Sequence, residues 1–129
     1  MTTRRVVVID SGVDPRHPAL RAHRIVPGPA FGPAGALCDG DGGTDRLGHG
    51  TAVAATLVRF LAAPPPVEIV SLRVFDREPV CDFTAVLHAL AHALTLRPAL
   101  VNLSLGTTSL RYRRELAALA AAAKAQGTR

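Results

Sequence analysis

The sequence predicts an α/β protein of three layers, in which helices cover both faces of a parallel β-sheet. Three apolar runs are typical of strands buried on both faces, because they are rich in Val, Ile and Leu and lack polar alternation. A stretch with helical spacing of its apolar residues follows each run, so the order is β-α-β-α-β-α. The length of 129 residues fits one domain that spans residues 1–129.

Residues that break regular structure bound each expected element. The expected strands cover residues 6–9, 67–74 and 99–106. The expected helices cover residues 51–61, 84–96 and 110–126. The first strand ends at the turn sequence Asp10-Ser11-Gly12, and the helices stop ahead of Pro64, Pro98 and Gly127.

Residues 15–46 are expected to form a long irregular segment. They contain five prolines and six glycines among few periodic apolar residues. Within them, residues 39–45 superficially resemble a calcium-binding loop. They lack the third acidic position, the glycine at position six and the terminal Glu of an EF-hand, which excludes that motif. A flexible loop and a looser cation site remain as alternatives.

The composition indicates a globular chain with a basic surface. Hydrophobic residues make up 48%, and the formal net charge is +5. Every basic residue except Lys124 is an arginine, and the arginines are scattered along the chain apart from a group at residues 111–114. Aromatic residues are only 4%, and no nucleic-acid-binding module is recognisable. We therefore expect a solvated basic surface and no nucleic-acid partner.

The sequence contains no apolar run of the ~18 residues that a membrane span requires. The run at residues 6–9 is too short for the core of a signal peptide and ends in an acid. We therefore expect a cytoplasmic protein with no membrane contact. In that compartment Cys38 and Cys81 are expected to be free thiols, and their spacing does not match a zinc site.

Two residues are candidates for chemistry. Asp10 ends the first expected strand, where open α/β sheets place their ligands. It either caps a turn or a helix, or it orients a cationic or proton-carrying partner. His49 lies between Gly48 and Gly50 at the start of a helix rich in small residues. It is either a structural or solvated histidine, or a proton carrier that works near neutral pH.

Other patterns give weaker indications. His88 and His92 are four residues apart in the second expected helix and could share a metal ion. The Glu of a metalloprotease helix is missing between them, so we expect ordinary, partly exposed histidines. No glycine-rich phosphate-binding motif follows the first strand, which disfavours nucleotide binding.

Three segments, in this order and spacing, closely resemble the N-terminal half of the subtilisin-like serine peptidases. They are Val-Val-Ile-Asp-Ser-Gly-Val-Asp at 7–14, Gly-His-Gly-Thr at 48–51 and Val-Asn-Leu-Ser-Leu-Gly at 101–106. The resemblance covers nearly the whole chain and implies a partial subtilisin-like fold. It implies that Asp10 is the aspartate of the catalytic triad and His49 its general base. The chemistry agrees, because a buried carboxylate fixes the imidazole tautomer and stabilises the imidazolium.

The resemblance also implies a substrate-binding cleft. Ser104, Leu105 and Gly106 match the segment whose backbone pairs with an extended substrate. Val80 and Cys81, which follow Pro79, match the opposite edge of that cleft. Such binding is β-augmentation, in which backbone hydrogen bonds supply affinity and pockets supply selectivity.

The chain departs from the resembled family in two respects. The nucleophilic serine and the asparagine of the oxyanion hole lie later in that family, and neither is found in these 129 residues. No serine of the chain, whether Ser11, Ser71, Ser104 or Ser109, matches the nucleophile. The usual calcium-ligand position is Ala19 here, so no cofactor is expected, and calcium stays an open alternative.

We therefore expect the Asp/His-bearing part of a subtilisin-like serine endopeptidase, a single incomplete domain that is inactive alone. A second polypeptide would supply the serine and the oxyanion asparagine. It would also cover the edge of the last strand, which half a sheet leaves unpaired. The alternative is a catalytically inactive subtilase-like module that binds a peptide or a partner protein.

Overall fold

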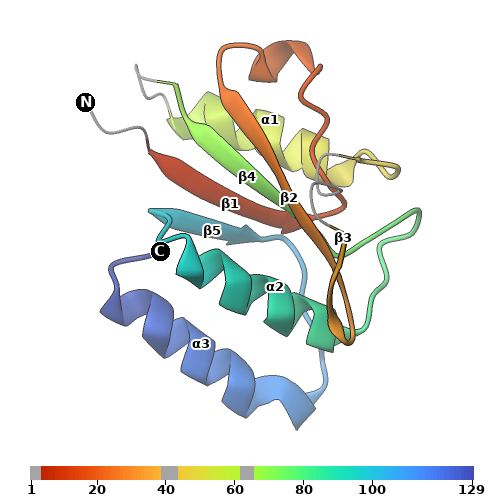
Figure 1. Ribbon diagram of the computed structural model, residues 1–129, viewed down its shortest axis with the longest axis vertical. Helices are drawn as coiled ribbons and strands as arrows, with labels where there is room; N and C mark the ends of the chain where they lie inside the picture. The colour runs from red at the N-terminus through yellow and green to blue at the C-terminus, as the bar shows by residue number, and fades with distance from the viewer. Residues whose placement is uncertain (1–3, 39–43, 62–65) are drawn as a thin grey trace.

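A computed structural model describes residues 4–38, 44–61 and 66–129 (Figure 1). The strands are β1 (Arg5–Asp10), β2 (Arg24–Gly32), β3 (Gly35–Cys38), β4 (Glu68–Arg73) and β5 (Leu100–Leu103). The helices are α1 (His49–Leu61), α2 (Phe83–Thr95) and α3 (Arg113–Ala125), with the 3-10 turns η1 (Pro18–Leu20) and η3 (Leu110–Tyr112). Among the described residues, no helix has the length and apolar character that crossing a membrane demands.

The five strands form one sheet in the order β3-β2-β4-β1-β5. β1 lies between β4 and β5 and pairs in parallel with both, Val6 being opposite Ile69 and Leu100. β2 pairs in parallel with β4, and of the strand pairs in the described residues only β2–β3 is antiparallel. The predicted α/β fold with a largely parallel sheet is therefore confirmed.

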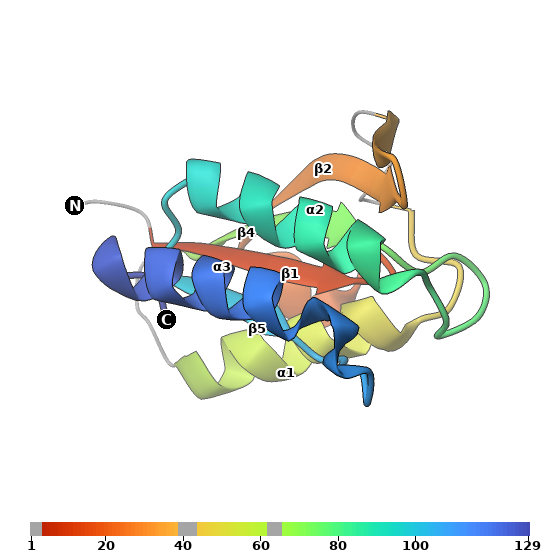
Figure 2. The ribbon, with the colours of Figure 1, turned by 90° about the horizontal axis from the view of Figure 1, so that it is seen from below.

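Helices cover both faces of the sheet, and α1 and α2 lie on opposite sides of it (Figure 2). Val6 and Val8 of β1 belong to the core beneath α1, whereas Val7 and Ile9 belong to the core beneath α2. This alternation follows from the two-residue period of a strand. All four residues are completely buried, which is why the run in the sequence is continuously apolar.

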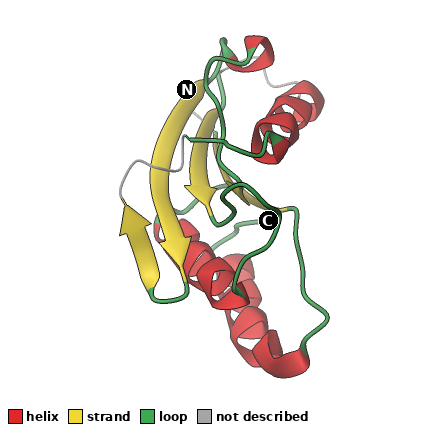
Figure 3. Ribbon diagram, turned by 90° about the vertical axis from the view of Figure 1, so that its right-hand side faces the viewer, coloured by secondary structure: helices red, strands yellow, loops and turns green. Residues whose placement is uncertain are grey.

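The prediction of an irregular segment over residues 15–46 is wrong for its middle part. β2 and β3 form an antiparallel hairpin there (Figure 3). The sequence Pro27-Gly28-Pro29 does not look like part of a strand, because prolines have no backbone N–H to donate to a neighbouring strand and usually mark turns. The pairing of β2 with β4 shifts register between Pro27 and Ala30, so the prolines fall where the ladder is interrupted. Gly28 also leaves little room for a side chain, since a Cβ atom would lie 2.5 Å from a methyl carbon of Leu72 and 3.0 Å from the Ser71 carbonyl oxygen.

The third strand is shorter than predicted. β5 ends at Leu103, which pairs with Ile9, and residues 104–106 continue outside regular structure. The reason lies in the segment after β1, which turns at Gly12, a glycine with a φ of 109°. Beyond Ile9, β1 no longer supplies a ladder for the third segment.

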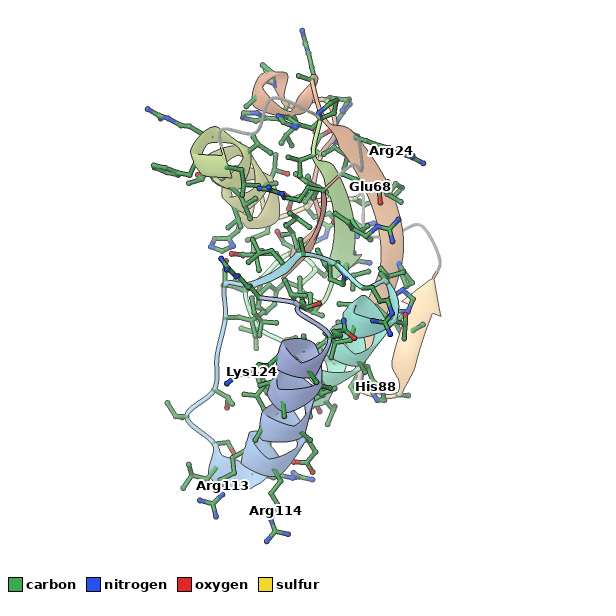
Figure 4. The ribbon with its side chains drawn as sticks, turned by 90° about the vertical axis from the view of Figure 1, so that its left-hand side faces the viewer. Arg24, Glu68, His88, Arg113, Arg114 and Lys124 are labelled. Atoms are coloured by element: carbon green, nitrogen blue, oxygen red, sulfur yellow. The ribbon has the colours of Figure 1, made fainter. Side chains whose placement is uncertain are left out.

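The amino ends of the strands carry a charged cluster. Glu68 is largely buried and forms ion pairs with Arg5 at 2.5 Å and with Arg24 at 3.5 Å. Figure 4 shows Arg24 and Glu68 on the adjoining strands β2 and β4. The same view shows Arg113 and Arg114 extending from the exposed start of α3, in keeping with a solvated basic surface.

Candidate active site

Asp10 and His49 meet where the end of β1 faces the start of α1. Nδ1 of His49 lies 2.8 Å from Oδ1 of Asp10 and 2.9 Å from Oδ2. The Asp10 side chain is fully buried, whereas that of His49 is 50% exposed. An ionised carboxylate only accepts hydrogen bonds, so Nδ1 carries the proton and donates it. In the neutral imidazole Nε2 then has a lone pair and can accept a proton from a third group.

Backbone amides hold Asp10 in this position. The amide of Ser11 donates to Oδ1 of Asp10 over 2.7 Å. The carbonyl oxygen of Asp10 accepts hydrogen bonds from the amides of Val74 and Phe75, at 2.8 and 3.4 Å. The end of β1 is therefore fastened through its backbone to the segment after β4, while the buried carboxylate accepts from the Ser11 amide and from Nδ1 of His49.

The approach of α1 to β1 depends on Gly50. A Cβ atom at this position would lie 2.1 Å from the carbonyl oxygen of Gly12 and 3.1 Å from Cβ of Asp10. Only a residue without a side chain lets the helix start come this close to the turn after β1. The adjoining Gly48 has a φ of +88°, which favours glycine for a conformational reason.

Two further residues of the site, Asp45 and Ser11, were not assigned this role from the sequence. The Asp45 carboxylate accepts hydrogen bonds from the Ser11 hydroxyl, the Leu47 and Gly48 amides, and the amide and hydroxyl of Thr51. Burial of this carboxyl raises its pKa, but these hydrogen bonds outweigh burial and hold the pKa below its ordinary value. An acid shortly before a helix start was the available signal.

A cleft of about 390 Å³ lies on one side of His49. It brings together every residue that the resemblance implied for substrate binding. Its lining comprises His49, Phe75, Pro79, Val80, Cys81, Phe83, Ser104, Leu105, Gly106 and Thr107. The loop before α2 therefore forms one wall and the segment after β5 the other. None of these lining residues carries a carboxylate or an amine.

Cys81 contributes a free, half-buried thiol to this cleft. Burial raises the pKa of the Cys81 thiol, and the negative charge of Asp82 raises it further. A raised pKa keeps the group protonated and poorly nucleophilic near neutral pH. We therefore assign Cys81 to the wall of the cleft and not to the role of a nucleophile.

A second hollow of about 390 Å³ lies on the other side of His49, between α1 and the end of β5. Its lining comprises His49, Ala52, Val53, Thr56, Leu57, Asn102 and Ser104. The α1 side is mostly apolar, and the β5 side is polar, because the Asn102 amide nitrogen donates to the Ser104 hydroxyl over 2.6 Å. His49 thus separates two hollows and faces both.

Among the described residues, no serine hydroxyl is hydrogen-bonded to the His49 ring. Ser11 is buried and donates to Asp45, and Ser71 is buried within β4. The hydroxyl of Ser104 accepts from Asn102, and that of Ser109 accepts from the Arg111 amide. Each serine that the sequence offered therefore lacks the contact that a nucleophile makes with its base.

The other sequence candidates lie away from this pair. His88 is exposed on α2, and His92 packs against Phe31 with ring centroids 5.5 Å apart. The described residues contain no group of three or more His, Cys, Asp or Glu side chains that could hold a metal ion. Ala19 lies in η1. Residues 39–43, where a loose cation site was an alternative, lie outside the described residues.

Comparison with known proteins agrees with this geometry. The sequence model of the subtilase family, peptidase family S8, matches residues 3–128. Among solved structures, the chain is similar to a lanthipeptide protease, with a TM-score of 0.61 and 27% sequence identity. The match covers 95% of this chain but 34% of that protease, so the chain spans about a third of its length. No curated protein sequence matches significantly.

Proposed function

Because the chain belongs to the subtilase family, we propose that it is the Asp/His-bearing part of a subtilisin-like serine endopeptidase. One observation carries the proposal: the buried Asp10 carboxylate holds Nδ1 of a half-exposed His49 at 2.8 Å. This is the arrangement that turns an imidazole into a general base for a hydroxyl nucleophile.

In the proposed reaction Nε2 of His49 accepts the proton of a serine hydroxyl as the serine attacks the peptide carbonyl. Asp10 remains ionised and stabilises the imidazolium that forms, because its carboxylate is already bonded to Nδ1. The imidazolium then gives the proton to the leaving amine, and water releases the acyl group by the same route.

We propose that a second polypeptide, or other sequence outside residues 1–129, supplies the serine and the oxyanion donor. The hollow between α1 and β5 supports this, because it opens directly beside His49. The edge of the sheet supports it as well, since β1 is the only described strand that pairs with β5. At the outer edge of β5, the Val101 amide donates to the Arg129 carbonyl at 2.7 Å and the Arg129 amide donates to the Ala99 carbonyl at 3.0 Å, so residue 129 pairs there as a residue of a neighbouring parallel strand would.

The proposed substrate is an extended peptide bound in the cleft between residues 79–81 and residues 104–106. The backbone of the segment after β5 has no ladder partner in the described chain, so it is free to pair with a peptide. The similarity to a lanthipeptide protease favours a lanthipeptide as the substrate.

The test is to express the tagged chain in its own cells and to treat the purified material with a fluorophosphonate, which labels only activated serines. We expect a labelled serine on a co-purifying polypeptide. Labelling should be abolished by His49→Ala and slowed about 10⁴-fold by Asp10→Asn, which imposes the wrong imidazole tautomer. Ser109→Ala, at the start of η3, serves as the control and should label at the wild-type rate.

Equal labelling in His49→Ala and in the wild-type complex would show that His49 is not the base. Absence of any labelled serine would remove the second-polypeptide proposal. Both outcomes can be read from the same gel, because the fluorophosphonate marks the serine-bearing polypeptide covalently.

A non-catalytic peptide-binding module is the second candidate function. One observation favours it: both walls of the cleft are present in the chain, whereas no serine hydroxyl is hydrogen-bonded to His49 among the described residues. Peptide affinity that is unchanged in Asp10→Ala and His49→Ala, together with absent serine labelling, would select this candidate. The cytoplasmic location expected from the sequence stays a prediction.

A further inference from the structure

We propose that Asp45 is a positioning residue, which holds His49 in register with Asp10. The inference rests on the proposed function, because it concerns the pair that would perform the proton transfer. It is carried by the hydrogen bonds that the Asp45 carboxylate accepts from both sides of the contact between β1 and α1.

Asp45 caps α1 in place of the residue that would normally do so. The first helical hydrogen bond runs from the Ala52 amide to the Gly48 carbonyl, so Gly48 is the N-cap. A glycine has no side chain with which to accept from the following amides. The Asp45 carboxylate, three residues earlier, accepts from the Gly48 amide at 2.7 Å and from the Thr51 amide at 3.0 Å.

Asp45 also sets the orientation of two hydroxyl groups. The Ser11 hydroxyl donates to Asp45 over 2.8 Å, so its oxygen is free to accept from the Gly50 amide at 2.9 Å. The Thr51 hydroxyl donates to the same carboxylate over 2.5 Å. Its oxygen in turn accepts from the Asp14 amide at 2.9 Å. A hydroxyl can donate only one hydrogen bond. When it donates this bond to the Asp45 carboxylate, the lone pairs of its oxygen are left to accept from the amides.

The resulting links join the immediate neighbours of the catalytic pair. Ser11 directly follows Asp10, and Gly50 directly follows His49. The hydrogen bond from the Gly50 amide to the Ser11 oxygen therefore fixes the spacing of the two backbones beside the pair. Asp45 fixes the same spacing a second time through the Thr51 hydroxyl, whose oxygen accepts from the amide of Asp14 in the segment after β1. Catalytic geometry is sensitive to displacements of about 1 Å, so this double fastening matters for the reaction.

A carboxylate suits this place better than an amide. All five groups that it contacts are donors, and a carboxylate offers only acceptors. In Asp45→Asn one oxygen becomes an NH₂ group that opposes a donor. Either the Ser11 link or the Thr51 link must then break, although the side chain keeps its size.

The test uses the 129-residue chain labelled with ¹⁵N-histidine, and it needs no peptidase activity. The readout is the exchange with solvent of the His49 Nδ1 proton, which is protected while it is bonded to the buried Asp10 carboxylate. The signal is assigned by its loss in His49→Gln. Asp45→Asn is expected to accelerate the exchange by about tenfold or more, because the pair opens more often.

Asp82→Asn is the matched control, since Asp82 caps α2 through the amide and hydroxyl of Thr84. It makes the same carboxylate-to-amide change at a helix cap remote from His49, and it should leave the His49 exchange unchanged. Unchanged exchange in folded Asp45→Asn would overturn the proposal, and so would equal acceleration in Asp82→Asn. If circular dichroism shows Asp45→Asn to be unfolded, Ser11→Ala decides: faster exchange supports the proposal and unchanged exchange overturns it. Faster exchange without serine labelling of the complex would refute the proposed function alone.

Discussion

The contact between α1 and β1 predicts that Gly50→Ala separates Asp10 from His49. The new Cβ would lie 2.1 Å from the Gly12 carbonyl oxygen, and such atoms do not approach closer than 3.0 Å. The helix start and the turn must therefore move apart by about 0.9 Å. Both clashing groups belong to or adjoin the backbone, so no side-chain rotation relieves the contact. The same displacement would stretch the 2.8 Å bond between His49 and Asp10 beyond hydrogen-bonding distance.

Two opposing effects determine how much Gly50→Ala changes the free energy of unfolding. Overpacking of a rigid site costs about 3 kcal/mol. Alanine gains at most about 1 kcal/mol of helix propensity over glycine. The net loss should therefore be about 2 kcal/mol of unfolding free energy, measured by urea denaturation, with loss of the protected His49 Nδ1 proton.

Gly127→Ala is the comparison for this prediction. Gly127 has a φ of +81° and no atom within 4 Å of the position that an added methyl group would take, so it tests backbone strain without a collision. The substitution should cost about 1 kcal/mol and leave the His49 proton protected. Protection of that proton in Gly50→Ala would refute the close-approach argument, because the pair would then have survived the displacement.

Three other predictions concern charge. Because the pKa of Asp45 is lowered in the folded chain, this residue stabilises the fold above the ordinary aspartate pKa of about 4, and the stabilisation is lost as the pH falls below that value. Asp45→Asn should therefore make the free energy of unfolding fall less steeply with acid. Arg5→Ala should destabilise the chain by about 1–2 kcal/mol in urea, more than Arg24→Ala, because Arg5 is the closer partner of the buried Glu68. Alkylation of Cys81, followed by peptide mapping, should need a higher pH than alkylation of the same cysteine in the denatured chain, because burial and Asp82 raise the pKa of the thiol; an equal or lower midpoint in the folded chain would contradict the burial argument.

Local sequence was sufficient for the parts of the fold that depend on local periodicity. The buried run at residues 6–9 and the apolar spacing of α1 and α2 each predicted an element within a residue or two of its observed bounds. β2 was not predictable in this way, because Pro27 and Pro29 are turn residues in most contexts. They are tolerated in a strand here since the register with β4 shifts between Pro27 and Ala30.

The candidate site likewise has a part that the sequence indicated and a part that only the packing decides. Residue type and order alone pointed to Asp10 and His49, because an acid after a buried strand and a histidine in a glycine turn are visible in the sequence. Their separation of 39 positions carries no information about distance, so only the packing of α1 against β1 decides that Nδ1 meets the carboxylate. The part played by Asp45 likewise depends on donors from both segments converging on one carboxylate. Sequence determines which groups can do this chemistry, and tertiary structure decides which of them meet, since hydrogen bonds act over about 3 Å.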